Sequence, residues 1–78
     1  MPKLPIVPAR KLIKVLKKAG FIHDRTEGSH YIFFREHDQR TVSVPVHKGK
    51  DLGKGLLMSI LKDADISPDE FLKYQYLK

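Results

Sequence analysis

The sequence contains no cysteine, so no disulfide can brace the chain, and a zinc site would need histidine and carboxylate ligands alone. It also contains no apolar run near the roughly 20 residues of a membrane span, and its N-terminus lacks the apolar core of a signal peptide. We therefore expect a cytoplasmic protein without a membrane segment. A length of 78 residues allows one hydrophobic core, which predicts a single domain over residues 1–78.

Acidic side chains are absent before Asp24, although six basic side chains have occurred by that point. The whole net charge of +6 lies in residues 1–51, because residues 52–78 hold four basic and four acidic side chains. An excess of this kind is typical of a surface that binds phosphates or an acidic protein partner. A solvated helix face that keeps the protein in solution is the alternative interpretation.

Apolar spacing and turn residues predict the element order α-β-β-β-α-α. Leu12, Val15, Leu16 and Ala19 recur at helical spacing, which predicts a first helix over residues 8–19. Three strands follow over residues 21–25, 30–35 and 41–46, and two more helices over residues 54–64 and 68–76. A three-stranded antiparallel sheet with helices packed on one face satisfies every apolar stripe, so we expect an α+β fold.

His30 is the strongest candidate for a catalytic side chain. It follows Gly28 and Ser29 at the start of an expected strand, and small neighbours let a substrate backbone approach closely. A histidine exchanges protons near neutral pH because its unperturbed pKa is about 6.5. RNA cleavage without a metal needs a base for the ribose 2′-hydroxyl, an acid for the leaving 5′-oxygen and a stabiliser for the phosphorane charge. A half-buried strand histidine bonded to the next strand is the alternative interpretation.

The exposure of His30 stays open at this stage. Strand alternation places Tyr31 and Phe33 on one face of the sheet, and His30 and Ile32 on the other. The pattern does not indicate which of the two faces the helices cover.

Lysines of the first helix and of the loop after the third strand form the candidate RNA-binding surface, together with the residues before His30. The candidates are Gly28, Ser29, Lys11, Lys14, Lys18, Lys48, Lys50 and Lys54. The loop over residues 48–55 fails the P-loop pattern, because its glycines are one residue too close and no Ser or Thr follows the lysine. A loop that enters a helix N-terminus still suits a phosphate, and a flexible solvated loop is the alternative.

Histidine spacing gives little support for a metal site. His23, His30 and His37 recur every seven residues, but they fall on two different strands and a hairpin tip. No pair of histidines has helical i, i+4 spacing. We therefore expect neither a metal nor another cofactor.

Six segments spread along the chain carry a family resemblance through their order and spacing. They are residues 1–5, 12–21, 28–30, 44–47, 55–61 and 66–72. Together they resemble the HicA (YcfA-like) toxins of bacterial and archaeal toxin–antitoxin systems. The resemblance implies a double-stranded-RNA-binding-domain-like fold and metal-independent mRNA cleavage, with His30 as the essential histidine of the glycine-serine-histidine motif. It also implies a HicB-like antitoxin that covers the catalytic surface.

Two departures from the family pattern qualify this resemblance. Members often carry a second histidine where this chain has Tyr31, which leaves the acid–base partner of His30 unassigned. A serine commonly caps the first helix, where this chain has Pro8.

The resemblance, together with the chemistry of metal-free RNA cleavage, predicts an mRNA interferase that leaves a 2′,3′-cyclic phosphate. A noncatalytic RNA-binding module of the same fold is the alternative, and a domain whose basic helix docks an acidic protein is a third hypothesis.

Overall fold

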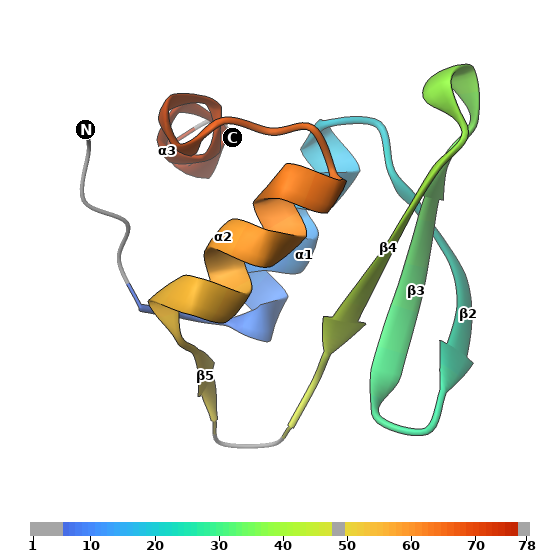
Figure 1. Ribbon diagram of the computed structural model, residues 1–78, viewed down its shortest axis with the longest axis horizontal. Coiled ribbons are helices and arrows are strands. Elements are labelled where there is room, and N and C mark those ends of the chain that lie inside the picture. Colours follow the sequence, from blue (N-terminus) through green and yellow to red (C-terminus); the bar gives the residue numbers. More distant parts are fainter. Residues whose placement is uncertain (1–5, 48–49, 77–78) are drawn as a thin grey trace.

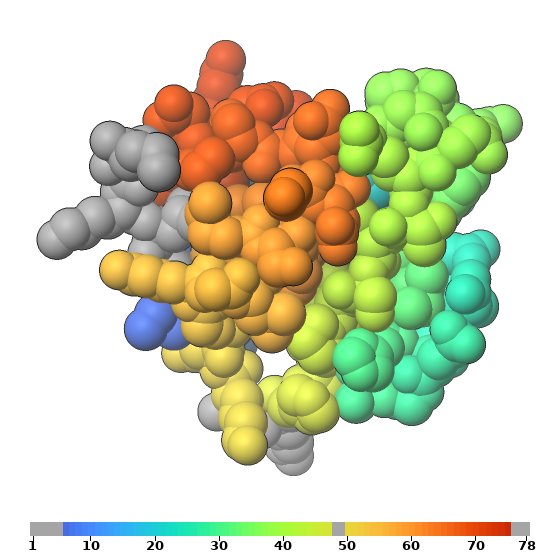
Figure 2. Space-filling model, in the orientation of Figure 1, coloured from blue at the N-terminus to red at the C-terminus, as the bar shows by residue number. Residues whose placement is uncertain are grey.

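Helices α1 and α2 cover one face of a three-stranded antiparallel sheet in the computed structural model, which describes residues 6–47 and 50–76 (Figure 1). The helices are α1 (Ala9–Lys18), α2 (Lys54–Asp63) and α3 (Pro68–Tyr76). The sheet consists of β2 (Ile22–Glu27), β3 (His30–Arg35) and β4 (Arg40–Pro45), with a short 3-10 turn over Glu36–Asp38. The expected α+β fold is thus confirmed. In the space-filling view α2 fills the middle of the face shown, and the green and cyan strands lie to its right (Figure 2).

The helices bury the apolar stripes that their sequences present. The fully covered side chains are Leu12, Val15 and Leu16 of α1, Leu57, Ile60 and Leu61 of α2, and Phe71 of α3. Removing each of these side chains from water contributes about 1.5–3 kcal/mol, which outweighs the modest helix propensity of such short segments.

The ends of the helices follow from local hydrogen bonds. Gly20 has a φ of +99° after α1, as its position at the expected helix end predicts, and Phe21 donates its N–H to the Leu16 carbonyl at 2.9 Å. At the start of α3, Ser67 and Glu70 form the expected capping box. The Glu70 N–H donates to Ser67 Oγ at 3.1 Å, and the Ser67 N–H donates to Glu70 Oε1 at 3.0 Å.

The sheet turns its inner face to the helices and its outer face away from them. Phe33, Val42 and Val44 are at most 1% exposed on the inner face. Alternation therefore places His30 on the outer face, where it is exposed. Ile32, on the same outer face, is buried but lies outside the core cluster.

Strand β2 is longer than the sequence pattern predicts. A turn over residues 26–29 was the expectation, but β2 continues to Glu27 and leaves Gly28 and Ser29 as a two-residue turn. The backbone of Gly28 has a φ of +60°, which the first position of a type II′ hairpin turn requires. The prediction of a four-residue turn is wrong because one glycine with positive φ is enough to reverse the chain.

A second, two-stranded ladder joins the segment before α1 to the expected loop over residues 48–55. It pairs β1 (Val7–Pro8) with β5 (Asp51–Leu52) in antiparallel register, and Val7 opposes Leu52. Both of these side chains are buried. The ladder therefore fixes the start of α1 beside the start of α2.

Arg35 is a buried charge that joins the hairpin to the ends of two helices. Its guanidinium donates to the carbonyls of Ala19 at 2.9 Å and Ala64 at 3.0 Å, the residues that end α1 and α2. It also pairs with Asp38 at 2.7 Å and lies 4.4 Å from the centre of the Phe21 ring. The hydrogen bond between Arg35 and Asp38 lowers the pKa of Asp38 to about 2 and raises the pKa of Arg35. A positive charge at two helix C-termini also complements their dipoles.

Candidate active site

His30 is exposed at the first position of β3, beside the hairpin turn. Its Nδ1 lies 3.3 Å from Ser43 Oγ on the neighbouring strand β4. A serine hydroxyl either donates to a ring nitrogen or accepts from its N–H, depending on the histidine tautomer. The contact engages Nδ1 of the ring.

Tyr31 lies on the inner face of the sheet, opposite to His30. Its side chain is half-buried against the core, and its ring centre lies 5.4 Å from that of His23. A side chain on that face cannot share a substrate with His30. Tyr31 is therefore no candidate for the acid–base partner of His30.

Two charged side chains of β2 occupy the outer face next to His30. The register pairs Glu27 directly with His30, and Arg25 with Ile32. Arg25 Nε lies 3.3 Å from a carboxylate oxygen of Glu27, and Arg25 Nη1 donates to Asp24 at 2.6 Å. The hydrogen bond to Asp24, followed by the charge of Glu27, raises the pKa of Arg25. The sequence did not single out Arg25 or Glu27, because their neighbours depend on a register that only the turn defines.

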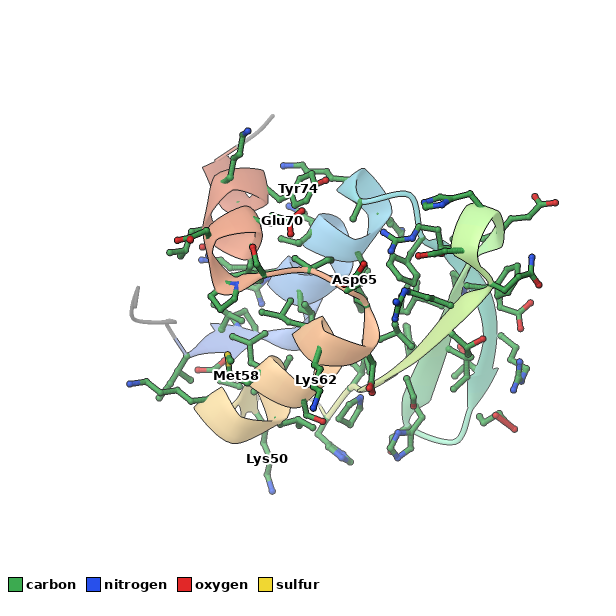
Figure 3. All side chains as sticks on the ribbon, turned by 45° about the horizontal axis from the view of Figure 1, so that its top comes forward. Lys50, Met58, Lys62, Asp65, Glu70 and Tyr74 are labelled. Atoms are coloured by element: carbon green, nitrogen blue, oxygen red, sulfur yellow. The ribbon has the colours of Figure 1, made fainter. Side chains whose placement is uncertain are left out.

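The lysines expected to bind RNA do not form one patch. Lys11 and Lys14 are exposed on α1, and Lys54 is exposed at the start of α2. Lys18 donates its Nζ hydrogen to the Tyr74 carbonyl of α3 at 3.1 Å. Figure 3 shows Lys50 extending from the end of the molecule opposite to Tyr74. Lys18 and Lys50 therefore lie at opposite ends.

The remaining expected residues lie at or next to the hairpin turn and the loop after β4. Gly28 and Ser29 form the turn itself, and the Ser29 carbonyl accepts a hydrogen bond from the Val46 N–H at 2.7 Å. Lys48 lies outside the described residues. The end of β4 is thus held against the turn that precedes His30.

A hollow of about 340 Å³ adjoins this turn. It is lined by Pro8, Ala9, Arg10, Val46, His47, Lys50 and Asp51. Arg10 and Lys50 supply two positive charges from different elements, His47 supplies a titratable ring, and Asp51 supplies one carboxylate. Val46 bonds the turn and also lines the hollow, so the hollow adjoins the loop that holds the turn before His30. The sequence did not single out Arg10 or His47 as RNA-binding residues.

Two searches of the described residues bear on other kinds of site. No group of three or more His, Asp or Glu side chains in residues 6–47 and 50–76 is arranged to hold a metal ion. No helix within the same ranges has the length and apolar character needed to cross a membrane.

The described ranges can be compared with known protein families. Residues 9–66, more than half of the chain, match the family model for the HicA toxin of bacterial toxin–antitoxin systems. The match spans His30, Ser43 and both charged residues of β2 discussed above. The chain therefore belongs to the HicA toxin family, as the resemblance predicted. Among curated proteins, none matches it significantly.

Proposed function

We propose that this protein is a metal-independent endoribonuclease that cleaves mRNA and acts as the toxin of a type II toxin–antitoxin pair. The observation that carries the proposal is the exposure of His30 on the outer face of the sheet, with its Nδ1 held by Ser43. An exposed ring with one nitrogen engaged can exchange a proton through the other nitrogen. Membership of the HicA toxin family supports the same function.

The proposed chemistry is an internal transfer within the RNA. The ribose 2′-oxygen attacks the adjacent phosphorus and loses its proton to a base. The bond from phosphorus to the 5′-oxygen breaks, and that oxygen takes a proton from an acid. His30 serves as one of these two groups, and the products are a 2′,3′-cyclic phosphate and a 5′-hydroxyl.

Basic side chains of the hollow beside the hairpin turn would bind phosphates farther along the RNA chain. Arg10 and Lys50 line this hollow, and Lys11 and Lys14 are exposed on the helix that begins there. Contacts of this kind release counterions, so affinity falls steeply as the salt concentration rises. A HicB-like antitoxin is the expected protein partner, and we propose that it inhibits cleavage in the cytoplasm by covering the outer face.

The test compares the wild-type protein with His30→Ala on a long RNA, after both have been treated with a chelator. We expect the wild type to leave 2′,3′-cyclic phosphate and 5′-hydroxyl ends. We expect His30→Ala to lose at least about 100-fold in cleavage rate, because general acid–base catalysis contributes about 10²–10⁴-fold. The melting temperature should not change, since His30 is exposed.

His37→Ala is the matched control, because His37 is also exposed but lies in the 3-10 turn that links β3 to β4. It should cleave at the wild-type rate. Equal cleavage by the wild type and His30→Ala, or ends with 3′-hydroxyls and 5′-phosphates, would overturn the proposal. Salt-sensitive RNA binding without cleavage would favour the noncatalytic module, and weak, salt-insensitive binding would favour a protein-docking domain.

A further inference from the structure

The outer face of the β2–β3 hairpin carries the two further groups that the proposed cleavage needs. We propose that Glu27 is the acid–base partner of His30 and that Arg25 is the cation that holds the phosphate being cleaved. This inference rests on the proposed function and assigns its missing residues.

The hairpin turn fixes the separation of Glu27 and His30. The two residues are directly opposed across the Gly28–Ser29 turn, so their Cβ atoms lie about 4.5–5.5 Å apart on the same face. Both side chains are exposed. Among the ion pairs of the described residues, none joins Glu27 to His30 within 4.0 Å. The carboxylate and the imidazole are therefore neighbours on one exposed face and are not joined in an ion pair, so we propose that a phosphodiester binds between them.

Arg25 completes the group from the same strand. Its Nε lies 3.3 Å from Glu27, and its side chain is 55% exposed, so a phosphate can reach the guanidinium. An arginine is permanently charged and presents a planar set of donors that matches phosphate oxygens. The ordinary interpretation is a surface ion pair, which adds little to stability because water screens it. A catalytic role is favoured because phosphodiester transfer requires a base, an acid and a cation, and one face of this hairpin carries all three.

The roles of the two titratable groups follow from their chemistry. An ionised carboxylate only accepts, so Glu27 takes the proton of the 2′-hydroxyl as the bond from O2′ to phosphorus forms. The protonated ring of His30 gives its Nε2 proton to the 5′-oxygen as the bond from phosphorus to O5′ breaks. Arg25 donates to the non-bridging oxygens, where negative charge develops. The step leaves a protonated glutamate and a neutral imidazole, and proton exchange with water restores both.

Within the part of the chain that the structure describes, the sheet register places one carboxylate directly opposite His30, that of Glu27. From β2 the charged neighbours are Glu27 and Arg25, whereas β4 contributes Ser43 and Pro45, which carry no charge. Asp24 lies at the register shift in β2 and is bound to Arg25 at 2.6 Å.

The decisive experiment measures single-turnover cleavage of RNA by Glu27→Gln as a function of pH, with Asp24→Asn as the matched control. Both substitutions remove one exposed carboxylate that is paired with Arg25. We expect the wild type to give a bell-shaped profile. Glu27→Gln should lose about 100-fold or more in rate and should also lose the acid limb of the profile. Asp24→Asn should keep both limbs and stay within a few-fold of the wild-type rate.

Two further variants separate a catalytic role from a structural one. Glu27→Asp keeps a carboxylate, so its pH profile should retain the acid limb while its rate is reduced. This variant also tests the assignment if Glu27→Gln fails to fold. Arg25→Ala should lower the rate more than Arg25→Lys, because lysine keeps the charge without the planar donor set. A Glu27→Gln protein that cleaves through an unchanged bell-shaped profile would overturn this assignment and leave His30-dependent cleavage standing. A wild type that does not cleave would overturn the proposed function and this assignment together.

Discussion

Ser43 reaches His30 across the β3–β4 ladder, and its hydroxyl determines which ring nitrogen is free. When Nδ1 carries a hydrogen, Ser43 Oγ accepts it, and the ring is then held with Nε2 toward the solvent. Both side chains are exposed. One hydrogen bond between exposed groups adds at most about 1 kcal/mol to stability, so we expect Ser43 to affect the reaction more than the fold.

Ser43→Ala should therefore lower the cleavage rate about tenfold, equivalent to about 1.4 kcal/mol in the barrier, and leave the melting temperature unchanged. Ser43→Thr keeps the hydroxyl and should cleave at nearly the wild-type rate. Thr41→Ala is the control, since Thr41 is exposed two residues away on the same strand and face. The ring ¹⁵N chemical shifts of His30 would report the change in tautomer. Equal rates for Ser43→Ala and Thr41→Ala would show that the contact does not orient His30.

At the scale of the elements, the β2–β3 hairpin positions the proposed catalytic pair, because its turn sets Glu27 opposite His30. Gly28 carries this turn with a φ of +60°, a conformation that other residues adopt only with strain. A Cβ added at Gly28 would meet nothing within 4 Å, so the backbone angle is the only obstacle to a side chain. Gly55 in α2 has equally open surroundings but a helical backbone.

The same substitution should therefore have opposite effects at these two glycines. Gly28→Ala should lower the free energy of unfolding by about 1–2 kcal/mol, the cost of a left-handed residue with a Cβ. Gly55→Ala should raise it by about 0.4–1 kcal/mol, because alanine restricts the unfolded chain and favours a helix. Urea unfolding midpoints measure both effects. A Gly28→Ala protein as stable as the wild type would contradict the turn geometry.

Elements whose apolar side chains repeat at a regular spacing were predictable from the sequence, and the shortest elements were not. The helices and β4 lie within a residue or two of their expected ranges, because their apolar side chains repeat at 3.6 or 2 residues, and β3 was expected from its aromatic and branched side chains. The two-residue strands β1 and β5 are too short to show a period. His30 could be named as a candidate, but its exposure depends on which face the distant helices cover. Its neighbour Glu27 depends on strand register, which the length of the hairpin turn sets, and the expected strands left four residues for a turn that has two.

At the scale of the whole molecule, Arg35 links the hairpin, α1 and α2 through a single guanidinium. A charged residue at a strand end is ordinarily expected at the surface, so no sequence pattern indicated this role. The site is nonetheless well suited to arginine, since two helix-terminal carbonyls and the Asp38 carboxylate all accept from it. The arrangement makes the stability of the molecule depend on one acidic side chain.

The low pKa of Asp38 determines in which direction the stability of the protein changes with pH. Its pKa falls from 3.8 to about 2 on folding, chiefly through the hydrogen bond to Arg35. As the pH falls, Asp38 therefore binds a proton in the unfolded chain before it does so in the folded protein. The stabilisation is fully present above about pH 4 and is lost as the pH falls toward 2. Asp38→Asn should lower the melting temperature at neutral pH and flatten its decline over this acid range. Thermal melts at a series of pH values test this, with the exposed Asp63→Asn as a control that should melt as the wild type does. An Asp38→Asn protein with the wild-type pH dependence would contradict it.

Because the core and the candidate site lie on opposite faces of the sheet, their sequences can change independently in evolution. The inner face carries Phe33, Arg35 and the buried valines, whereas the outer face carries His30, Ser43 and Glu27. Substitutions on the outer face leave the packing of the core intact, so selection can alter the chemistry without first repairing the fold. Under the proposed function, one frame could pass between related RNA targets, or lose cleavage and keep binding, through changes confined to one side of three short strands.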